Sequence, residues 1–316
     1  MIDNFLFSLS SALPIFFVMI IGYYLKRRAI INEQFVKAAN MLVFNVALPV
    51  KIFSDVYSTS FEEYFDIRFV MFIIIGTIVS VMISWVTGAL LIKDSNKLGA
   101  FIQGSFRGNF LYIGLSLMEN VTGSIGMKAP LVIALIIPLY NILAIVVLSF
   151  LEVDRQSNVD LRGIVKNIVG NPMIIAVVLG MVVSQFGLNL PLIMTRTMSY
   201  FEVVATPLAL IAIGASFKFG NMKGNLNTAL LASSLKLILL PAFAVISAIA
   251  LGFGNEDVFL IYILFGVPTA TISYVVTVVM KGDHDLASNI IMVSTLLSNV
   301  SMTLYVFIFK TMGYLN

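Results

Sequence analysis

The chain contains no cysteine, only one histidine and few charged residues. Without cysteine it forms neither disulfides nor thiolate metal sites. Only 11% of the 316 residues are charged, whereas 59% are hydrophobic. A soluble domain carries roughly twice that charged fraction, so a soluble globular fold is excluded. The net charge of +3 gives no reason to expect a nucleic-acid partner, and no cofactor or metal site is predicted.

The sequence consists instead of long apolar segments joined by short polar ones. The segments are about 20 residues or longer and do not alternate, which predicts membrane-spanning helices and not barrel strands. The first covers residues 5–25 and is followed by Lys26, Arg27 and Arg28. A signal peptide would carry its charges before the apolar part, so this segment is predicted to be a retained helix.

The apolar segments predict an all-α integral membrane protein with ten transmembrane helices. No segment outside them is long enough for a soluble domain, so function is expected inside the lipid bilayer. The predicted helices are residues 5–25, 34–56, 67–92, 98–120, 128–151, 163–187, 191–218, 225–252, 256–280 and 285–311.

The distribution of lysine and arginine predicts the orientation of these helices. Cytoplasmic loops carry an excess of Lys and Arg, and one set of loops holds twelve of them against five in the opposite set. The twelve are Lys26, Arg27, Arg28, Lys37, Lys93, Lys97, Arg155, Arg162, Lys166, Lys218, Lys223 and Lys281. This predicts a multi-pass protein of the cell membrane with both termini outside the cytoplasm.

The two halves of the chain resemble each other at a shift of 158 residues, half of 316. Prolines and glycines coincide at Pro14 and Pro172, Gly22 and Gly180, Pro49 and Pro207, and Gly108 and Gly266. Because each half contains five helices, an odd number, the halves must enter the membrane in opposite directions. The pattern predicts an inverted repeat, which is typical of secondary transporters.

The stretch from Phe265 to Tyr274 predicts a break in the ninth helix. Gly266 and Pro268 interrupt the helix, and hydroxyl side chains follow at once. A harmless proline kink is an equally acceptable interpretation of this stretch alone. The repeat, however, pairs Gly266 with Gly108, so a second break is predicted at Gly108-Asn109 in the fourth helix.

Two opposed breaks would bring two helix N-termini together near the centre of the bilayer. Each carries roughly half a positive charge and several free amides, so the pair would bind an anion without a metal. Asn109, Thr269 and Thr271 are predicted to cap these ends or to contact a bound carboxylate. Arg107 could grip the carboxylate, or equally balance the helix ends or lie in a vestibule.

Lys236 is the candidate cation for the negative C-termini at the breaks. A lysine at mid-span costs roughly 2.5–3.5 kcal/mol on insertion scales, so it should face a polar interior and a partner. Besides compensating the helix dipoles, Lys236 could bind a proton or contact the substrate. The alternative is a structural ion pair with Glu202.

Several segments together resemble the auxin efflux carrier (AEC) family, which includes plant auxin exporters and bacterial malate and malonate permeases. The resemblance spans essentially the whole chain, with Ala205–Ala215 as its most specific part. The other matching segments are Leu42–Pro49, Phe106–Asn109 with Ile113–Leu115, Asn171-Pro172 with Leu179-Gly180, Lys236–Pro241 and Val267–Thr269.

The resemblance implies two five-helix repeats, here 1–151 and 163–316, joined by a short cytoplasmic linker at 152–162. It implies a sodium/proton-antiporter-like fold with crossed fourth and ninth helices. Helices 1, 2, 6 and 7 would form a scaffold, and helices 3–5 and 8–10 an elevator-like transport domain. Substrate contacts would fall on Asn109, Pro268 and Thr269. The plant carriers have a proline at the fourth-helix crossover, whereas this chain has none between Gly104 and Glu119.

The leading hypothesis is therefore a secondary transporter of a small organic anion, such as malate or an auxin-like acid. A channel and an intramembrane enzyme are the alternatives; the sequence has no paired intramembrane aspartates and no metalloprotease motif, which disfavours the enzyme. Direction of transport, proton or sodium coupling, and a homodimeric state are left open.

Overall fold

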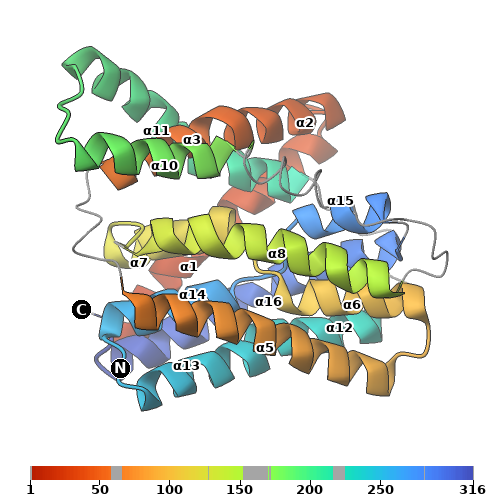
Figure 1. The fold of residues 1–316 in the computed structure, drawn as a ribbon. Helices are drawn as coiled ribbons and strands as arrows, with labels where there is room; N and C mark the ends of the chain where they lie inside the picture. Colours follow the sequence, from red (N-terminus) through yellow and green to blue (C-terminus); the bar gives the residue numbers. More distant parts are fainter. Residues whose placement is uncertain are drawn as a thin grey trace.

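A computed structural model describes residues 2–57, 66–126, 128–151, 170, 172–215, 225–280 and 282–315. Throughout these ranges the chain is helical, apart from turns, short connections and one isolated antiparallel bridge between Gly108 and Thr269. Figure 1 shows the helices running side by side in a bundle, with the two termini close together. Asn4 donates a hydrogen bond to the Thr311 hydroxyl at 3.3 Å, so both termini lie on the same side of the molecule.

The first half of the chain contains α1 (Ile2–Arg27), α2 (Glu33–Leu42), η1 (Val43–Ala47), α3 (Leu48–Tyr57), α5 (Ile67–Leu91), α6 (Ser95–Phe106), η2 (Phe110–Gly114), α7 (Leu115–Thr122) and α8 (Ala129–Leu151). The second half contains α10 (Pro172–Gln185), α11 (Leu192–Ala215), α12 (Leu226–Ser234), η4 (Leu235–Leu239), α13 (Leu240–Ala250), α14 (Asn255–Gly266), α15 (Ile272–Val279) and α16 (His284–Thr311). The η elements are single π-helical turns that continue into the neighbouring helices.

One set of helices, the α11 group, consists of α1, α2, η1, α3, α10 and α11. Within it α11 packs against α1 and α3, and α3 packs against α10. Small residues allow close approach: a Cβ on Gly214 would lie 1.8 Å from the Met19 carbonyl oxygen, and one on Gly22 would lie 2.2 Å from that of Ile211. Such small-residue contacts replace the hydrophobic effect as the source of helix association in lipid.

The remaining helices form the α14 group, and α14 is its centre. Every residue from Val258 to Gly266 is buried. It packs most closely against α13 and also contacts η4, η2 and α7, and its Phe259 ring lies 5.6 Å from the Phe309 ring of α16 (Figure 1). The two groups are joined mainly where α1 packs against α16, with smaller contacts between α1 and α7 and between α10 and α8.

A cluster of charges ties together the ends of three helices in the α14 group. Lys128, before α8, pairs with Asp66 at 3.2 Å and with Asp257 at 2.8 Å, and it lies over the Phe69 ring. Asp66 also caps α5 by accepting hydrogen bonds from the amides of Arg68 and Phe69. Burial would raise the pKa of Asp66, but these hydrogen bonds outweigh it and lower the pKa below its ordinary value.

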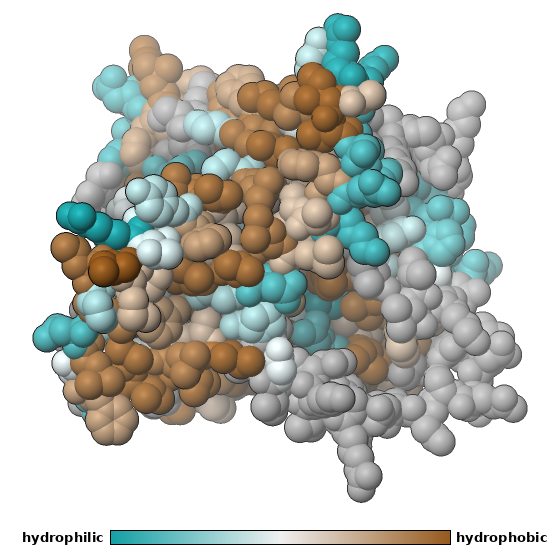
Figure 2. Space-filling model, turned by 90° about the horizontal axis from the view of Figure 1, so that it is seen from above, coloured by the Kyte–Doolittle hydropathy of each residue, from teal (hydrophilic) through white to brown (hydrophobic). Residues whose placement is uncertain are grey.

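The exterior of the bundle is strongly apolar. Figure 2 shows broad areas of hydrophobic residues on the face that carries α10 and α11. Large side chains on α11 are exposed there, including Ile193 at 81% and Val203 at 74%. In a water-soluble protein such a surface would aggregate, so it is a surface for lipid.

Six described helices are long and apolar enough to cross a membrane: 33–54, 67–91, 129–148, 192–215, 226–250 and 284–311. The chain is thus a multi-pass membrane protein. The expected count of ten spans stays a prediction, because the fourth and ninth predicted helices are each divided into shorter pieces. The linker expected at 152–162 and the start of the sixth predicted helix lie outside the described residues.

We predict that Gly214→Ala destabilises the protein by about 1–3 kcal/mol, since the added methyl group collides with the backbone of α1. Val203→Ile adds the same single carbon at an exposed position of the same helix and is the matched control. Thermal unfolding in detergent measures both variants. Equal unfolding temperatures would show that α1 and α11 are not in close contact.

We also predict that Asp66→Asn lowers the unfolding temperature at neutral pH. A carboxyl group whose pKa is lowered by folding stabilises the protein above its unfolded pKa of about 3.9, and this contribution is lost as the pH falls. The difference between wild type and variant should therefore shrink as the pH is lowered from 7 to 3. A difference that is independent of pH would show that the Asp66 charge contributes nothing.

Candidate functional site

The first interruption lies where α6 ends, at Phe106, and η2 begins, at Phe110. The break predicted at Gly108-Asn109 is thus present as a gap between two helical elements, and so is the break predicted between Phe265 and Tyr274. Asn109 occupies the N-cap position of η2 with φ −82° and ψ 60°, which is not helical. Its side chain makes no capping hydrogen bond, so the expected capping role of the Asn109 amide is not what the structure shows.

The second interruption separates α14, which ends at Gly266, from α15, which begins at Ile272. Val267 is extended, with φ −71° and ψ 154°, as expected for a residue before proline. Pro268 has no amide hydrogen and cannot continue the helical ladder. A Cβ on Gly266 would lie 2.5 Å from the Tyr262 ring and 3.2 Å from Pro241, so this glycine also allows close packing at the break.

The two interruptions cross and are hydrogen-bonded to each other. The backbone amide of Asn109 donates to the Pro268 carbonyl at 2.7 Å, and the backbone amide of Ala270 donates to the Arg107 carbonyl at 3.0 Å. These two bonds satisfy backbone groups that the breaks would otherwise leave unpaired in the apolar interior. A Cβ on Gly108 would lie 3.0 Å from the Leu264 carbonyl oxygen and 3.0 Å from the Lys236 ammonium, so only glycine fits easily at the crossing.

Thr269 fixes the crossing to its surroundings. It is fully buried, and its hydroxyl donates to the Gly104 carbonyl at 2.6 Å. Its amide donates to the Ser294 hydroxyl of α16 at 3.1 Å. Thr271 is half-buried and precedes α15, where its carbonyl accepts from the Tyr274 amide at 3.2 Å. Several amides at this second break therefore already have acceptors, so fewer of them are free than the sequence predicted.

Lys236 lies in η4 and is completely buried. Its ammonium donates to the Phe265 carbonyl at 2.8 Å and to the Phe106 carbonyl at 3.3 Å. These carbonyls belong to the last residue of α6 and the next-to-last residue of α14, where each helix carries its partial negative charge. One cation thus contacts the C-terminal ends of both first half-helices. No ion pair joins it to Glu202 within the described chain; Glu202 is half-buried on α11.

Arg107 lies in the extended segment between α6 and η2, and only 3% of it is exposed. Its Nη2 donates to the Asn141 side-chain oxygen of α8, while its Nη1 has no hydrogen-bond partner among the described residues. Asn141 thus fixes one edge of the guanidinium group. The other edge carries a buried donor that is free to bind a ligand.

Asn109 supplies a second buried donor. It is 3% exposed, and its Nδ2 has no partner in the described part of the chain. Arg107 and Asn109 flank Gly108, the residue at which the two interruptions cross. Unpaired buried donors are uncommon in folded proteins, and two of the same kind next to a helix N-terminus indicate an anionic or carbonyl ligand.

Two polar residues near the crossing were not predicted from the sequence. Gln103, one turn before the first break, donates to the Ser273 carbonyl at 2.8 Å, and Ser294 accepts from Thr269. The Gln103 Oε1 and the Ser273 hydroxyl are also buried without partners among the described residues. Gln103 could have been noticed as a mid-span amide close to a break, whereas Ser294 resembles the other hydroxyl residues of α16.

A membrane bundle with two broken helices that cross in its interior is the architecture of a transporter. The family model described as membrane transport protein matches residues 7–163 and, a second time, residues 158–306. The chain belongs to this family, which is the auxin efflux carrier family that its motifs resemble. The double match agrees with the repeat read at a shift of 158 residues.

Curated relatives extend over nearly the same length. An uncharacterized transporter of Methanothermobacter thermautotrophicus is 26% identical over 95% of this chain and 98% of its own. The uncharacterized transporter MJ1031 of Methanocaldococcus jannaschii is 22% identical over 93% and 96%. The uncharacterized transporter YfdV of Escherichia coli K12 is 24% identical over 84% and 85%. These relatives indicate a membrane transporter, and their names specify no substrate.

We predict that Lys236→Ala abolishes transport and lowers the unfolding temperature. The substitution leaves two buried carbonyls without their donor, at a cost of roughly 1–3 kcal/mol each. Lys236→Arg keeps the charge and should retain part of the activity. Lys93→Ala, at an exposed lysine, is the control. Transport at the wild-type rate by the Lys236→Ala protein would contradict the assigned role.

Proposed function

We propose that this chain is a secondary transporter that moves a small organic anion across the cell membrane by alternating access at the helix crossing. The observation that carries the proposal is the pair of unpaired buried donors, Arg107 Nη1 and Asn109 Nδ2, at the start of the second half-helix. A carboxylate matches both in charge and in hydrogen bonding. Malate and auxin-like acids are the substrates to test first.

The polarity of the crossing also favours an anion. The negative ends of α6 and α14 are already compensated by Lys236, so they do not repel a carboxylate. The N-terminal end of η2 keeps its positive partial charge, because the first amides of a helix have no acceptor within the helix. Gly108, Pro268 and Thr269 would shape the site, and Thr271 would line its edge. Glu202 and Lys236 are the residues through which a proton could be coupled to transport.

The proposed arrangement is ten spans in two inverted repeats, 1–151 and 163–316, with both termini outside the cytoplasm. The α11 group corresponds to the predicted scaffold, and the α14 group to the predicted transport domain. The support is that helices of each group pack mainly against one another, apart from the contact between α1 and α16 and smaller contacts such as those of α1 with α7 and of α10 with α8. Transport would then proceed by displacement of the α14 group along the α11 group. A sodium or proton gradient, or neither, would drive it, and a homodimer is compatible with the apolar face of α11.

The test is counterflow in proteoliposomes made with the purified chain. Vesicles loaded with unlabelled malate, malonate or an aromatic carboxylate should accumulate the labelled compound transiently, which a channel would not do. Current that is linear with voltage and shows no counterflow would favour the channel alternative. Absence of flux for every carboxylate, with flux of a cation or a neutral compound, would overturn the anion assignment.

We predict that Asn109→Asp and Arg107→Lys weaken carboxylate transport. The first variant keeps the shape but places a negative charge at the donor position, and the second removes the guanidinium fork. Loss of a hydrogen bond to a charged group is worth roughly 1.5–3 kcal/mol, or about 10- to 150-fold in apparent KM. Asn45→Asp, at an exposed asparagine of the α11 group, is the control for the charge introduced by the first variant. Unchanged apparent KM in both variants would exclude these donors from the site.

A further inference from the structure

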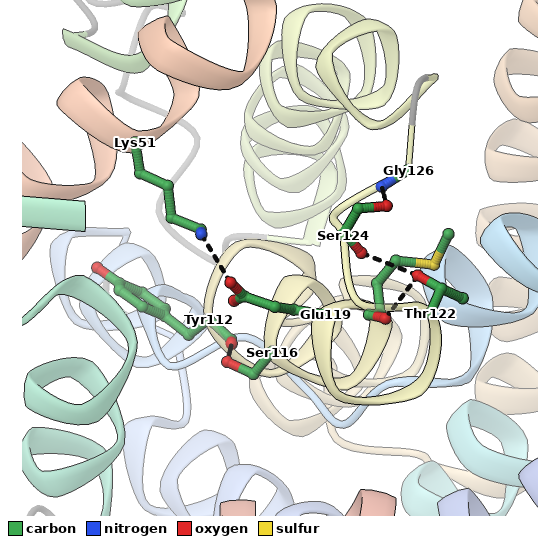
Figure 3. Close-up of polar contacts among 8 residues, drawn as sticks. Lys51, Tyr112, Ser116, Glu119, Thr122, Ser124 and Gly126 are labelled. Atoms are coloured by element: carbon green, nitrogen blue, oxygen red, sulfur yellow. Dashed lines mark hydrogen bonds and ion pairs between the residues drawn. The ribbon is translucent and has the colours of Figure 1, made fainter. Parts of the chain in front are cut away.

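An ion pair connects the two helix groups away from the crossing. The Lys51 ammonium of α3 lies 3.0 Å from the Glu119 carboxylate of α7, and Figure 3 shows the two side chains reaching toward each other from separate helices. Only 11% of the Lys51 side chain is exposed, compared with 41% of the Glu119 side chain. Glu119 is therefore the carboxylate that balances a largely buried cation.

The helices that carry these residues have little contact with each other. Helix α3 packs against α10, α11 and η1 of its own group and makes a smaller contact with α8 of the α14 group. Helix α7 continues from η2 and packs against α1 and α14. Close packing of α3 against α7 is therefore not what brings the two side chains together.

The Lys128 cluster provides a contrast within the same protein. Lys128 pairs with two carboxylates and lies over an aromatic ring, and all of these residues belong to the α14 group. That arrangement joins three helix ends of one group through several contacts. Lys51 contacts one carboxylate, on the other helix group, through one pair of atoms. An isolated ion pair contributes less stabilisation than a network of several charges, so it is broken more easily.

Glu119 is also on the half-helix that begins at the crossing. It follows Asn109 by ten residues of continuous η2 and α7, about 15 Å along the helix. A displacement of the crossing relative to α3 would therefore carry Glu119 away from Lys51. The ion pair has to break whenever η2 and α7 move along the α11 group.

We propose that Lys51 and Glu119 form a releasable electrostatic latch that holds the α14 group in the position of this structure. The latch regulates the proposed alternating access and rests on that proposed function. Breaking the ion pair lowers the barrier to displacement of the α14 group, and restoring it with the charges exchanged restores the barrier. Lys51 and Glu119 are thus positioning residues and do not contact the substrate.

The experiment uses the absence of cysteine in the chain, which makes every introduced thiol unique. Spin labels on Tyr200→Cys of α11 and Leu90→Cys of α5, both exposed positions, report the distance between the two groups in proteoliposomes. We expect one main distance in the parent protein. Glu119→Gln or Lys51→Gln should add a second distance, and Lys51→Glu with Glu119→Lys should remove it again. Glu33→Gln breaks the ion pair with Lys26 within the α11 group and is the matched control.

Exchange of labelled malate by the same proteins is measured in parallel. We expect at least a twofold faster exchange for Glu119→Gln than for the Glu33→Gln control. A reducible bifunctional thiol cross-linker between Lys51→Cys and Glu119→Cys should stop exchange, and reductant should restore it.

The distances and the fluxes test different statements. The same single distance in all variants, or full exchange by the cross-linked protein, would overturn the latch. A lower unfolding temperature without a second distance would also overturn it, because it would show a merely structural ion pair. Distances that respond as expected, while no carboxylate is exchanged by the parent protein, would leave the latch standing and refute the proposed substrate class.

Discussion

The structure depends above all on how backbone groups are satisfied where two helices are broken inside an apolar bundle. Hydrocarbon offers no water to unpaired amides and carbonyls, so each broken end needs a partner from the protein. The Lys236 ammonium supplies it for both C-terminal ends, and the strand-like crossing of Asn109 with Pro268 and of Ala270 with Arg107 supplies it for the segments between. These few contacts allow a polar centre to exist in a chain that is 59% hydrophobic.

The same solution bears on the proposal that the transported compound is an anion. The cation is used to neutralise the helix C-termini, so it does not by itself hold a ligand. Among the described residues, Arg107 Nη1 and Asn109 Nδ2 at the first break have no partner, and neither has the Ser273 hydroxyl of α15 after the second break. At the second break, Thr269 donates through both its amide and its hydroxyl. The unpaired guanidinium and amide donors thus lie at the first break, whereas Thr269 fixes the second.

Much of this organisation could be predicted before the structure was known. The length of the apolar segments indicated membrane helices, the loop charges predicted their orientation, and the pairing of Gly108 with Gly266 placed both breaks. The lone mid-span lysine was recognisable because a buried charge in a membrane needs a partner. No ion pair with its alternative partner, Glu202, is found among the described residues, and sequence spacing does not show which carbonyls lie within reach of an ammonium on another helix. Similarly, Thr271 and Asn109 were expected to cap helix ends, but the Asn109 side chain makes no cap.

The sequence by itself determined the class of protein, the positions of the breaks and the residue types available at them, because these follow from hydropathy, glycine, proline and charge along one chain. Only the tertiary structure decided which groups meet. Lys236 contacts Phe106, 130 residues away, and Lys51 contacts Glu119, 68 residues away. Such pairings depend on how helices distant in sequence are packed and rotated, and local sequence patterns carry no information about that rotation.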